Sequence, residues 1–78
     1  MPYIKSELRS RAWVAPEGAG PLCYALSKQV NDYRLRFGDS FATFADILAA
    51  LEATKLEFYR RVIAPYEDRK CAENGDVY

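Results

Sequence analysis

Tyrosines and arginines lie close together in the last third of the sequence. Tyr59 is followed directly by Arg60 and Arg61, and Tyr66 stands three residues before Arg69. An arginine guanidinium forms paired hydrogen bonds with a phosphate, and it can stack with an aromatic ring. These residues are therefore candidates for binding a planar, anionic ligand. The other interpretation is a charged helix face that is solvated or forms salt bridges between subunits.

Two more residues could contribute to the same site. Lys55 falls on an apolar side of the segment, with Leu51 and Phe58 on either side of it. Glu52 lies three residues before Lys55, close enough on a helix to form an ion pair. Lys55 is either a ligand-binding cation inside a helix bundle or a lysine whose head reaches water or Glu52. Tyr24, from an earlier segment, could supply the opposite wall of the ligand site.

The sequence lacks the residues and motifs that most catalytic, zinc and phosphate sites use. The chain has no histidine, the commonest general base and transition-metal ligand, so Ser27 and Ser40 have no histidine base to activate them. Cys23 and Cys71 have no closely spaced partner for a zinc site, and we expect both to be free, mostly buried thiols. No glycine-rich phosphate loop is present. We therefore expect no enzymatic activity, no metal and no cofactor.

Length and composition indicate one small folded domain over residues 1–78. The 11 Lys and Arg balance the 11 Asp and Glu, and half of the residues are hydrophobic. A neutral chain offers little counterion release, so nucleic acid is not an expected partner. No apolar run approaches the roughly 20 residues that span a bilayer, and the first residues lack the hydrophobic stretch of a signal peptide. We expect a cytoplasmic protein without membrane contacts.

The first regular helix is predicted over residues 21–37. Pro21 suits the first position of a helix, and Gly38 is typical of the residue that follows the last turn. The apolar residues between them recur every three or four positions, as on one side of an amphipathic helix. These residues are Leu22, Leu26, Val30, Tyr33 and Phe37.

A longer helix is predicted over residues 41–73, after Ser40 as its N-cap. Asn74 and Gly75 form the stop signal, and Pro65 is expected to kink or break the helix because it removes a hydrogen bond to the carbonyl of Arg61. Two apolar stripes run along this segment. The first contains Phe41, Phe44, Leu48, Leu51, Phe58 and Val62, and the second contains Ala45, Ala49, Leu56, Tyr59, Ile63 and Tyr66.

The two ends of the chain are expected to be irregular. Residues 1–20 predict an arm that lies over the domain, with a helical turn or two over residues 5–12 and a break over residues 16–21. The expected anchors of this arm are Tyr3, Ile4, Leu8, Trp13 and Val14. The tail, residues 74–78, is predicted to fold back onto the helices or to dock on a neighbouring subunit.

These elements predict an all-α protein, in which a short and a long helix form a hairpin. As one rod, residues 41–73 would be about 50 Å long, whereas a compact chain of this length has a radius of gyration of about 12 Å. Two apolar stripes on one helix need more partner surface than the remaining chain supplies. We therefore expect a homodimer or higher oligomer. The alternative is a monomeric three-helix fold that breaks at Pro65.

Several segments resemble a family of small uncharacterised proteins met in phage, bacterial and environmental sequences. Residues 51–70 read LEATKLEFYRRVIAPYEDRK and residues 72–78 read AENGDVY, similar to that family's LECxKLELYRRVxxPYEDxKxxENGDV. The opening MPYIK also matches, and residues 20–26 are similar to its GDLNYAI, with Pro21 and Cys23 in place of Asp and Asn. The resemblance implies a small helical, phage-associated protein that acts in the host cytoplasm. It implies no particular activity.

Two functional hypotheses follow. In the first, a non-enzymatic helical oligomer binds or sequesters an anionic nucleotide-like ligand at sites between subunits. In the second, a helical interaction or structural protein docks on a host or viral protein and has no small-molecule ligand.

Overall fold

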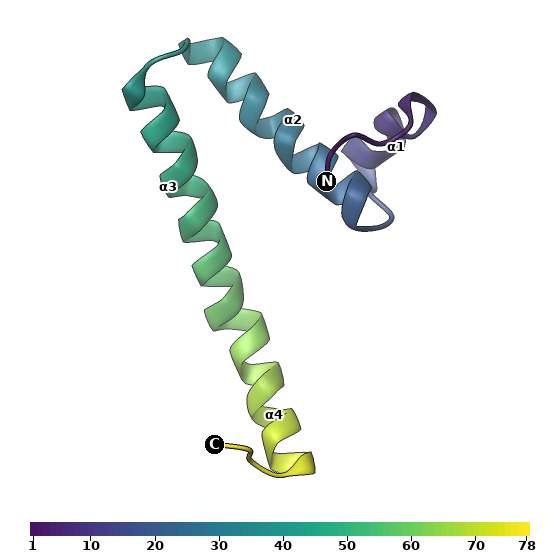
Figure 1. Ribbon diagram of the computed structural model, residues 1–78, viewed down its shortest axis with the longest axis vertical. Helices are drawn as coiled ribbons and strands as arrows, with labels where there is room; N and C mark the ends of the chain where they lie inside the picture. Colours follow the sequence, from purple (N-terminus) through teal and green to yellow (C-terminus); the bar gives the residue numbers. More distant parts are fainter. The chain divides into compact units, whose positions relative to one another are not determined.

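The computed structural model describes all residues, 1–78, and its regular structure is entirely helical (Figure 1). The elements in chain order are the 3-10 turn η1 (Ser6–Leu8), α1 (Arg9–Val14), α2 (Ala19–Phe37), α3 (Phe41–Phe58), the π-helical turn η2 (Tyr59–Ile63) and α4 (Ala64–Asn74). The chain divides into two compact units, Met1–Ile47 and Leu48–Tyr78. The predicted all-α class, with one short and one long helix, is confirmed.

The N-terminal unit is built where α1 packs against α2. Ala12 of α1 is completely buried, and it is the one buried hydrophobic residue of the chain. A Cβ atom added to Gly20 would lie 3.2 Å from the Cγ2 atom of Ile4. Glycine at this position therefore lets the start of the chain lie close against the first turn of α2.

The N-terminal arm is more regular than the sequence suggested. Residues 6–14 are helical, and the break is limited to the residues between Val14 and Ala19. Of the five expected anchors only Ile4 is half-buried. Tyr3, Leu8, Trp13 and Val14 are all exposed, so the expectation that they anchor the arm was wrong. Ala12 takes that role because its small side chain allows α1 to approach α2 closely.

Helix α2 begins at Ala19, two residues before the predicted start at Pro21. Gly18 precedes the helix with a φ of 120°, a backbone conformation that favours glycine. Pro21 still lies in the first turn, where the missing N–H would have had no partner within the helix.

The connection between α2 and α3 follows the predicted capping signals. Gly38 has a φ of 87°, and its N–H donates to the carbonyl of Arg34 at 2.7 Å. The Ser40 hydroxyl accepts a hydrogen bond from the N–H of Thr43 at 3.1 Å, which caps α3. At the other end, Gly75 has a φ of 96° and its N–H donates to Cys71, so the predicted helix stop is also confirmed.

The helical backbone continues from Phe41 through Pro65 to Asn74, so the expected break at this proline is absent. The π-helical turn η2 immediately precedes it. The N–H of Ala64 donates to the carbonyl of Tyr59, five residues back, instead of four. This wider turn accommodates the proline, since Pro65 has no N–H to offer Arg61 and its ring would clash with that carbonyl in a regular α-helix.

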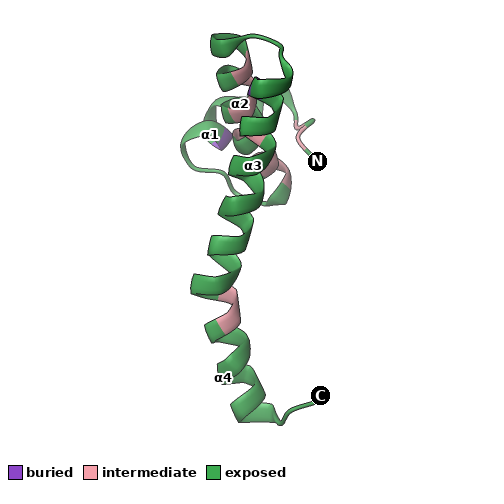
Figure 2. Cartoon of the chain, turned by 90° about the vertical axis from the view of Figure 1, so that its left-hand side faces the viewer, coloured by how far each residue is buried: buried purple, intermediate pink, exposed green.

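The C-terminal unit is a single helical segment followed by a short tail, and it has no core (Figure 2). None of its side chains is buried, and only Ile63 and Ala64 are half-buried. The tail does not fold back, because Val77 and Tyr78 are 87% and 112% exposed. The apolar stripes predicted for this helix are therefore present and have no partner within the unit.

Candidate functional site

The first part of the predicted site is a group of charges around the π-helical turn. The Arg60 guanidinium lies 2.6 Å from a carboxylate oxygen of Glu57, and the Arg61 guanidinium lies 3.7 Å from the same oxygen. Tyr59, beside them, is about half exposed. Two cations therefore share one carboxylate, which leaves a net positive charge next to an accessible aromatic ring.

Tyr66 is the second centre of the predicted site. The guanidinium carbon of Arg69 lies 5.8 Å from the centre of the Tyr66 ring, and the ammonium group of Lys70 lies 5.6 Å from it. Lys70 also forms an ion pair with Glu73 at 3.2 Å, whereas Arg69 forms none. Half of Tyr66 is exposed, so this ring and the Arg69 cation are both accessible to a ligand.

Lys55 lies on the surface of the C-terminal unit. Its ammonium group is 3.6 Å from a carboxylate oxygen of Glu52, as the spacing predicted, and 73% of its side chain is exposed. Within one chain Lys55 therefore has the ordinary arrangement of a surface lysine that reaches water and Glu52. Six of the candidate residues belong to this unit. They are Lys55, Tyr59, Arg60, Arg61, Tyr66 and Arg69.

Tyr24 belongs to the N-terminal unit, where it contacts a residue that the sequence did not indicate. The guanidinium carbon of Arg9 lies 5.3 Å from the centre of the half-buried Tyr24 ring. This contact forms because α1 packs on α2. The contact between Arg9 and Tyr24 could not be predicted from their spacing in the sequence, since the two residues lie in different helices.

The best-formed polar contacts of the N-terminal unit lie beside the turn before α3. Arg34 donates two hydrogen bonds to Asp39, at 2.6 and 3.1 Å. The hydrogen bond from Arg34 lowers the pKa of Asp39 and, reciprocally, the pKa of Arg34 is raised by this carboxylate. Tyr33 donates to Asp46 at 3.2 Å, and its pKa is raised by desolvation first and by Asp46 second. These contacts fix the turn.

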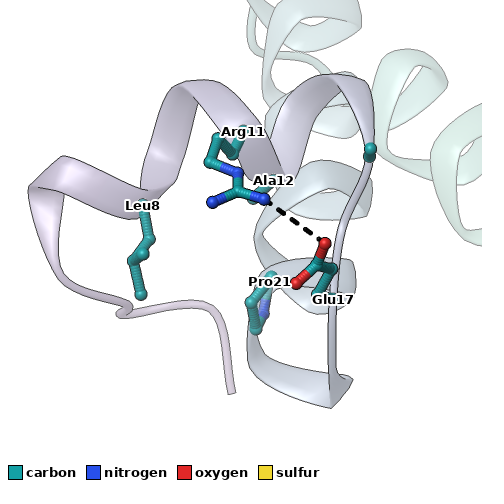
Figure 3. A pocket seen from close by; sticks show the side chains of 6 residues that line it. Leu8, Arg11, Ala12, Glu17 and Pro21 are labelled. Atoms are coloured by element: carbon teal, nitrogen blue, oxygen red, sulfur yellow. Dashed lines mark hydrogen bonds and ion pairs between the residues drawn. The ribbon is translucent and has the colours of Figure 1, made fainter.

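A small hollow lies between α1 and the loop that leads into α2 (Figure 3). It has a volume of about 100 Å³, and it is lined by Leu8, Arg11, Ala12, Ala15, Glu17 and Pro21. Arg11 and Glu17 form an ion pair at 3.4 Å on its rim. Small-molecule sites usually occupy about 300 to 1,000 Å³, so this hollow is too small for a nucleotide. None of the predicted ligand residues lines it.

Both cysteines are free, as expected, but they are not mostly buried. Cys23 is half-buried in α2 and Cys71 is exposed on α4. The expectation of buried thiols was wrong for Cys71 because α4 has no neighbouring element in its unit to cover it.

The chain brings together no group of three side chains with the ligand chemistry for a metal ion. None of its helices combines the length and apolar character needed to cross a membrane.

A family model described as a domain of unknown function, DUF6899, matches residues 1–77. The chain belongs to the DUF6899 family. The match covers almost the whole chain, including both units and every candidate residue. Searches among curated proteins and among solved structures found no match. Membership in DUF6899 thus agrees with the uncharacterised family that the sequence resembles, and it assigns no activity.

Proposed function

We propose that this DUF6899 protein is a non-enzymatic helical protein that works as a homo-oligomer and binds an anionic, nucleotide-like ligand between subunits. The exposed apolar side chains of residues 48–66 support self-assembly. Burying apolar surface contributes about 25 cal/mol per Å², and a helix with apolar residues on most sides is usually enclosed by partners.

The observation that carries the ligand proposal is the contact of two cations, Arg69 and Lys70, with the Tyr66 ring. This ring is half exposed, two cations lie within 6 Å of its centre, and Arg69 has no carboxylate partner. A planar base could stack on such a ring while a phosphate accepts hydrogen bonds from the guanidinium. Arg60 and Arg61 would add further positive charge, because they share the single carboxylate of Glu57.

Subunit assembly is needed for such a site. A helix on its own encloses no volume, so the walls around Tyr66 must come from another surface. Tyr24 and Lys55 remain candidates for the surrounding wall, and we propose that assembly brings the site residues of different copies together. The resemblance to phage sequences supports a role in the cytoplasm of an infected host, where such a protein would sequester a nucleotide.

A thermal-shift screen of mononucleotides, dinucleotides and cyclic dinucleotides tests this proposal. A ligand at 100 times its dissociation constant adds about 2.7 kcal/mol of stability, which raises the melting temperature measurably. Arg69→Ala should abolish the shift. Arg36→Ala is the matched control, since Arg36 also lies over an aromatic ring, Phe37, but on α2. If no compound shifts the melting temperature of the wild-type protein, the ligand proposal is wrong.

The second candidate is an interaction protein that docks on a host or viral protein. The observation that favours it is the exposed apolar stripe of α2, which includes Leu22, Leu26 and Phe37. Contiguous apolar surface of this kind marks protein interaction sites. A pull-down from host lysate should recover a partner that Leu26→Lys releases and that Lys28→Ala, on the polar side, retains. Equal recovery with both variants would contradict this role.

A further inference from the structure

We propose that two copies of the chain pair through residues 48–58 as antiparallel helices, with the two-fold axis beside Ala53 and with Lys55 of each copy bound to Glu52 of the partner subunit. This inference rests on the proposed function and deepens it, because it names the surface through which the copies associate. The spacing of four exposed side chains and the position of one ion pair beside them support it.

Four exposed side chains form a continuous strip along α3. They are separated by three, four and three positions, and they are Leu48, Leu51, Lys55 and Phe58. At about 100° per residue, the four fall within an arc of about 80° around the helix axis. Leu48, Leu51 and Phe58 are 67%, 43% and 56% exposed. A strip with this spacing is typical of a helix that packs lengthwise against another helix.

This strip is complementary to itself when the second copy runs in the opposite direction. Leu48 lies five positions before Ala53, and Phe58 lies five positions after it. Leu51 and Lys55 are each two positions away. Each contact occurs twice, because a two-fold interface uses the same surface on both copies. Leu48 therefore packs on Phe58 of the partner subunit, and the aliphatic stem of Lys55 packs on Leu51 of the partner subunit.

The ion pair beside the strip determines the relative direction of the two helices. Glu52 lies about 40° beyond Leu48 around the axis, on the edge of the strip where Lys55 also lies. Within one chain, its carboxylate is 3.6 Å from the Lys55 ammonium group. In an antiparallel pair these edges of the two copies meet, so each ammonium group lies between its own Glu52 and Glu52 of the partner subunit. A parallel pair would place Lys55 against Lys55 of the partner subunit.

The residues that carry the ligand proposal lie outside the paired stretch. Arg60, Arg61, Tyr66 and Arg69 all follow Phe58, the last paired position. One extra residue in the π-helical turn η2 holds Tyr66 about 20° from Phe58 around the axis, instead of about 80° in a regular α-helix. The Tyr66 ring therefore points to the side of the helix on which the partner lies, and the partner supplies the second surface that the ligand site needs.

The pairing also gives Lys55 a role. Its ammonium group stabilises the contact between the copies, so it is not part of the wall around the ligand. The cations left for the ligand are those near Tyr66, and the pairing neutralises none of them.

Charge reversal tests the pairing in the full chain, without any nucleotide. We expect sedimentation equilibrium to show about tenfold weaker dimerisation for Lys55→Glu and for Glu52→Lys, because each replaces two attractions between the copies by two repulsions. An equimolar mixture of the two variants should recover an affinity within about threefold of the wild type, because every pair between unlike chains is attractive again. The repulsion inside each chain is the same alone and in the mixture.

Lys28→Glu is the control for these variants, because it breaks the ion pair with Asp32 on α2 and should leave the dissociation constant unchanged. Two results would overturn the proposal. The first is a Glu52→Lys variant that dimerises as tightly as the wild type, and the second is a mixture as weak as its components.

Cysteine cross-linking measures the direction of the helices independently. In the proposed pair, the two Leu48 residues are ten positions apart along the helix, about 15 Å, and so are the two Phe58 residues. This distance is too long for a disulfide. With both native cysteines replaced by serine, oxidation should leave Leu48→Cys and Phe58→Cys uncross-linked when each is alone and should cross-link a mixture of the two.

A disulfide formed by either variant alone would indicate a parallel pair, and a mixture that forms none would exclude the contact. Either result overturns the proposal. Because no nucleotide is involved, these results are independent of the thermal-shift screen, and the pairing and the ligand proposal can fail separately.

Discussion

Replacing Pro65 by alanine tests the reason for the π-helical turn. The substitution supplies an N–H that can donate to the carbonyl of Arg61, and it removes the ring that excludes a regular α-helical turn. Proline is about 3 kcal/mol less favourable than alanine in a helix interior. The wider turn already relieves part of this cost, so we expect a gain of about 1 to 3 kcal/mol, the lower value corresponding to one added hydrogen bond.

Thermal melting followed by circular dichroism measures this gain at a fixed protein concentration. For a chain of this size, each 1 kcal/mol corresponds to a shift of roughly 4 to 8 °C. Pro16→Ala is the matched control, because Pro16 lies in the loop between α1 and α2 and its replacement adds no helical hydrogen bond. The control should show no rise in melting temperature.

Loss of the π-helical turn should also change the direction in which Tyr66 points around the helix axis relative to Phe58. Tyr66 would move from about 20° to about 80° away from Phe58, and the helix should be more stable. Hydrogen exchange should show a protected amide at position 65. A melting temperature equal to that of the wild type, together with rapid exchange at position 65, would refute this explanation of the turn.

Three smaller predictions concern the turn between α2 and α3. The pKa of Asp39 is lowered in the folded state, so its contribution to stability is complete above the ordinary carboxyl pKa and is lost as the pH falls through the lowered value. Asp39→Asn should therefore flatten the acid limb of a plot of melting temperature against pH, and an unchanged limb would contradict it. Ser40→Ala should cost about 1 kcal/mol through loss of the N-cap, measured by urea unfolding, whereas Ser27→Ala in α2 should cost little. Gly38→Ala should cost at least about 1 kcal/mol from backbone strain alone, since an added Cβ meets no atom within 4 Å, and an unchanged urea midpoint would argue against the positive φ.

Local signals in the sequence determined much of the fold. Ser40, Gly38 and Gly75 mark helix ends through contacts with residues three or four positions away, and such contacts need no tertiary structure. The pairing of Glu57 with Arg60 and Arg61 could be predicted for the same reason.

Contacts between elements could not be derived in this way. Nothing about Ala12 in the sequence indicates that it is the buried residue of α1, because alanine is common on every kind of helix face. The effect of Pro65 was predicted as a kink or break because a proline removes one hydrogen bond. The sequence does not reveal that the backbone absorbs this loss by widening the preceding turn.

The candidate site was predicted only as a set of residues on one helix. Spacing places Tyr66 near Arg69, and the structure agrees. The surroundings of a ligand depend on surfaces that a single helix cannot supply, so neither the sequence nor one copy of the chain defines the walls of the site.

Residues 48–78 have no core of their own, and we propose that they associate with a second copy. Light scattering coupled to gel filtration measures this most directly, because it gives the mass of the particle without reference to its shape. One chain has a mass of 8.9 kDa, and we expect a particle of about 18 kDa or a larger multiple. A well-folded, cooperatively melting particle with the mass of one chain would contradict it.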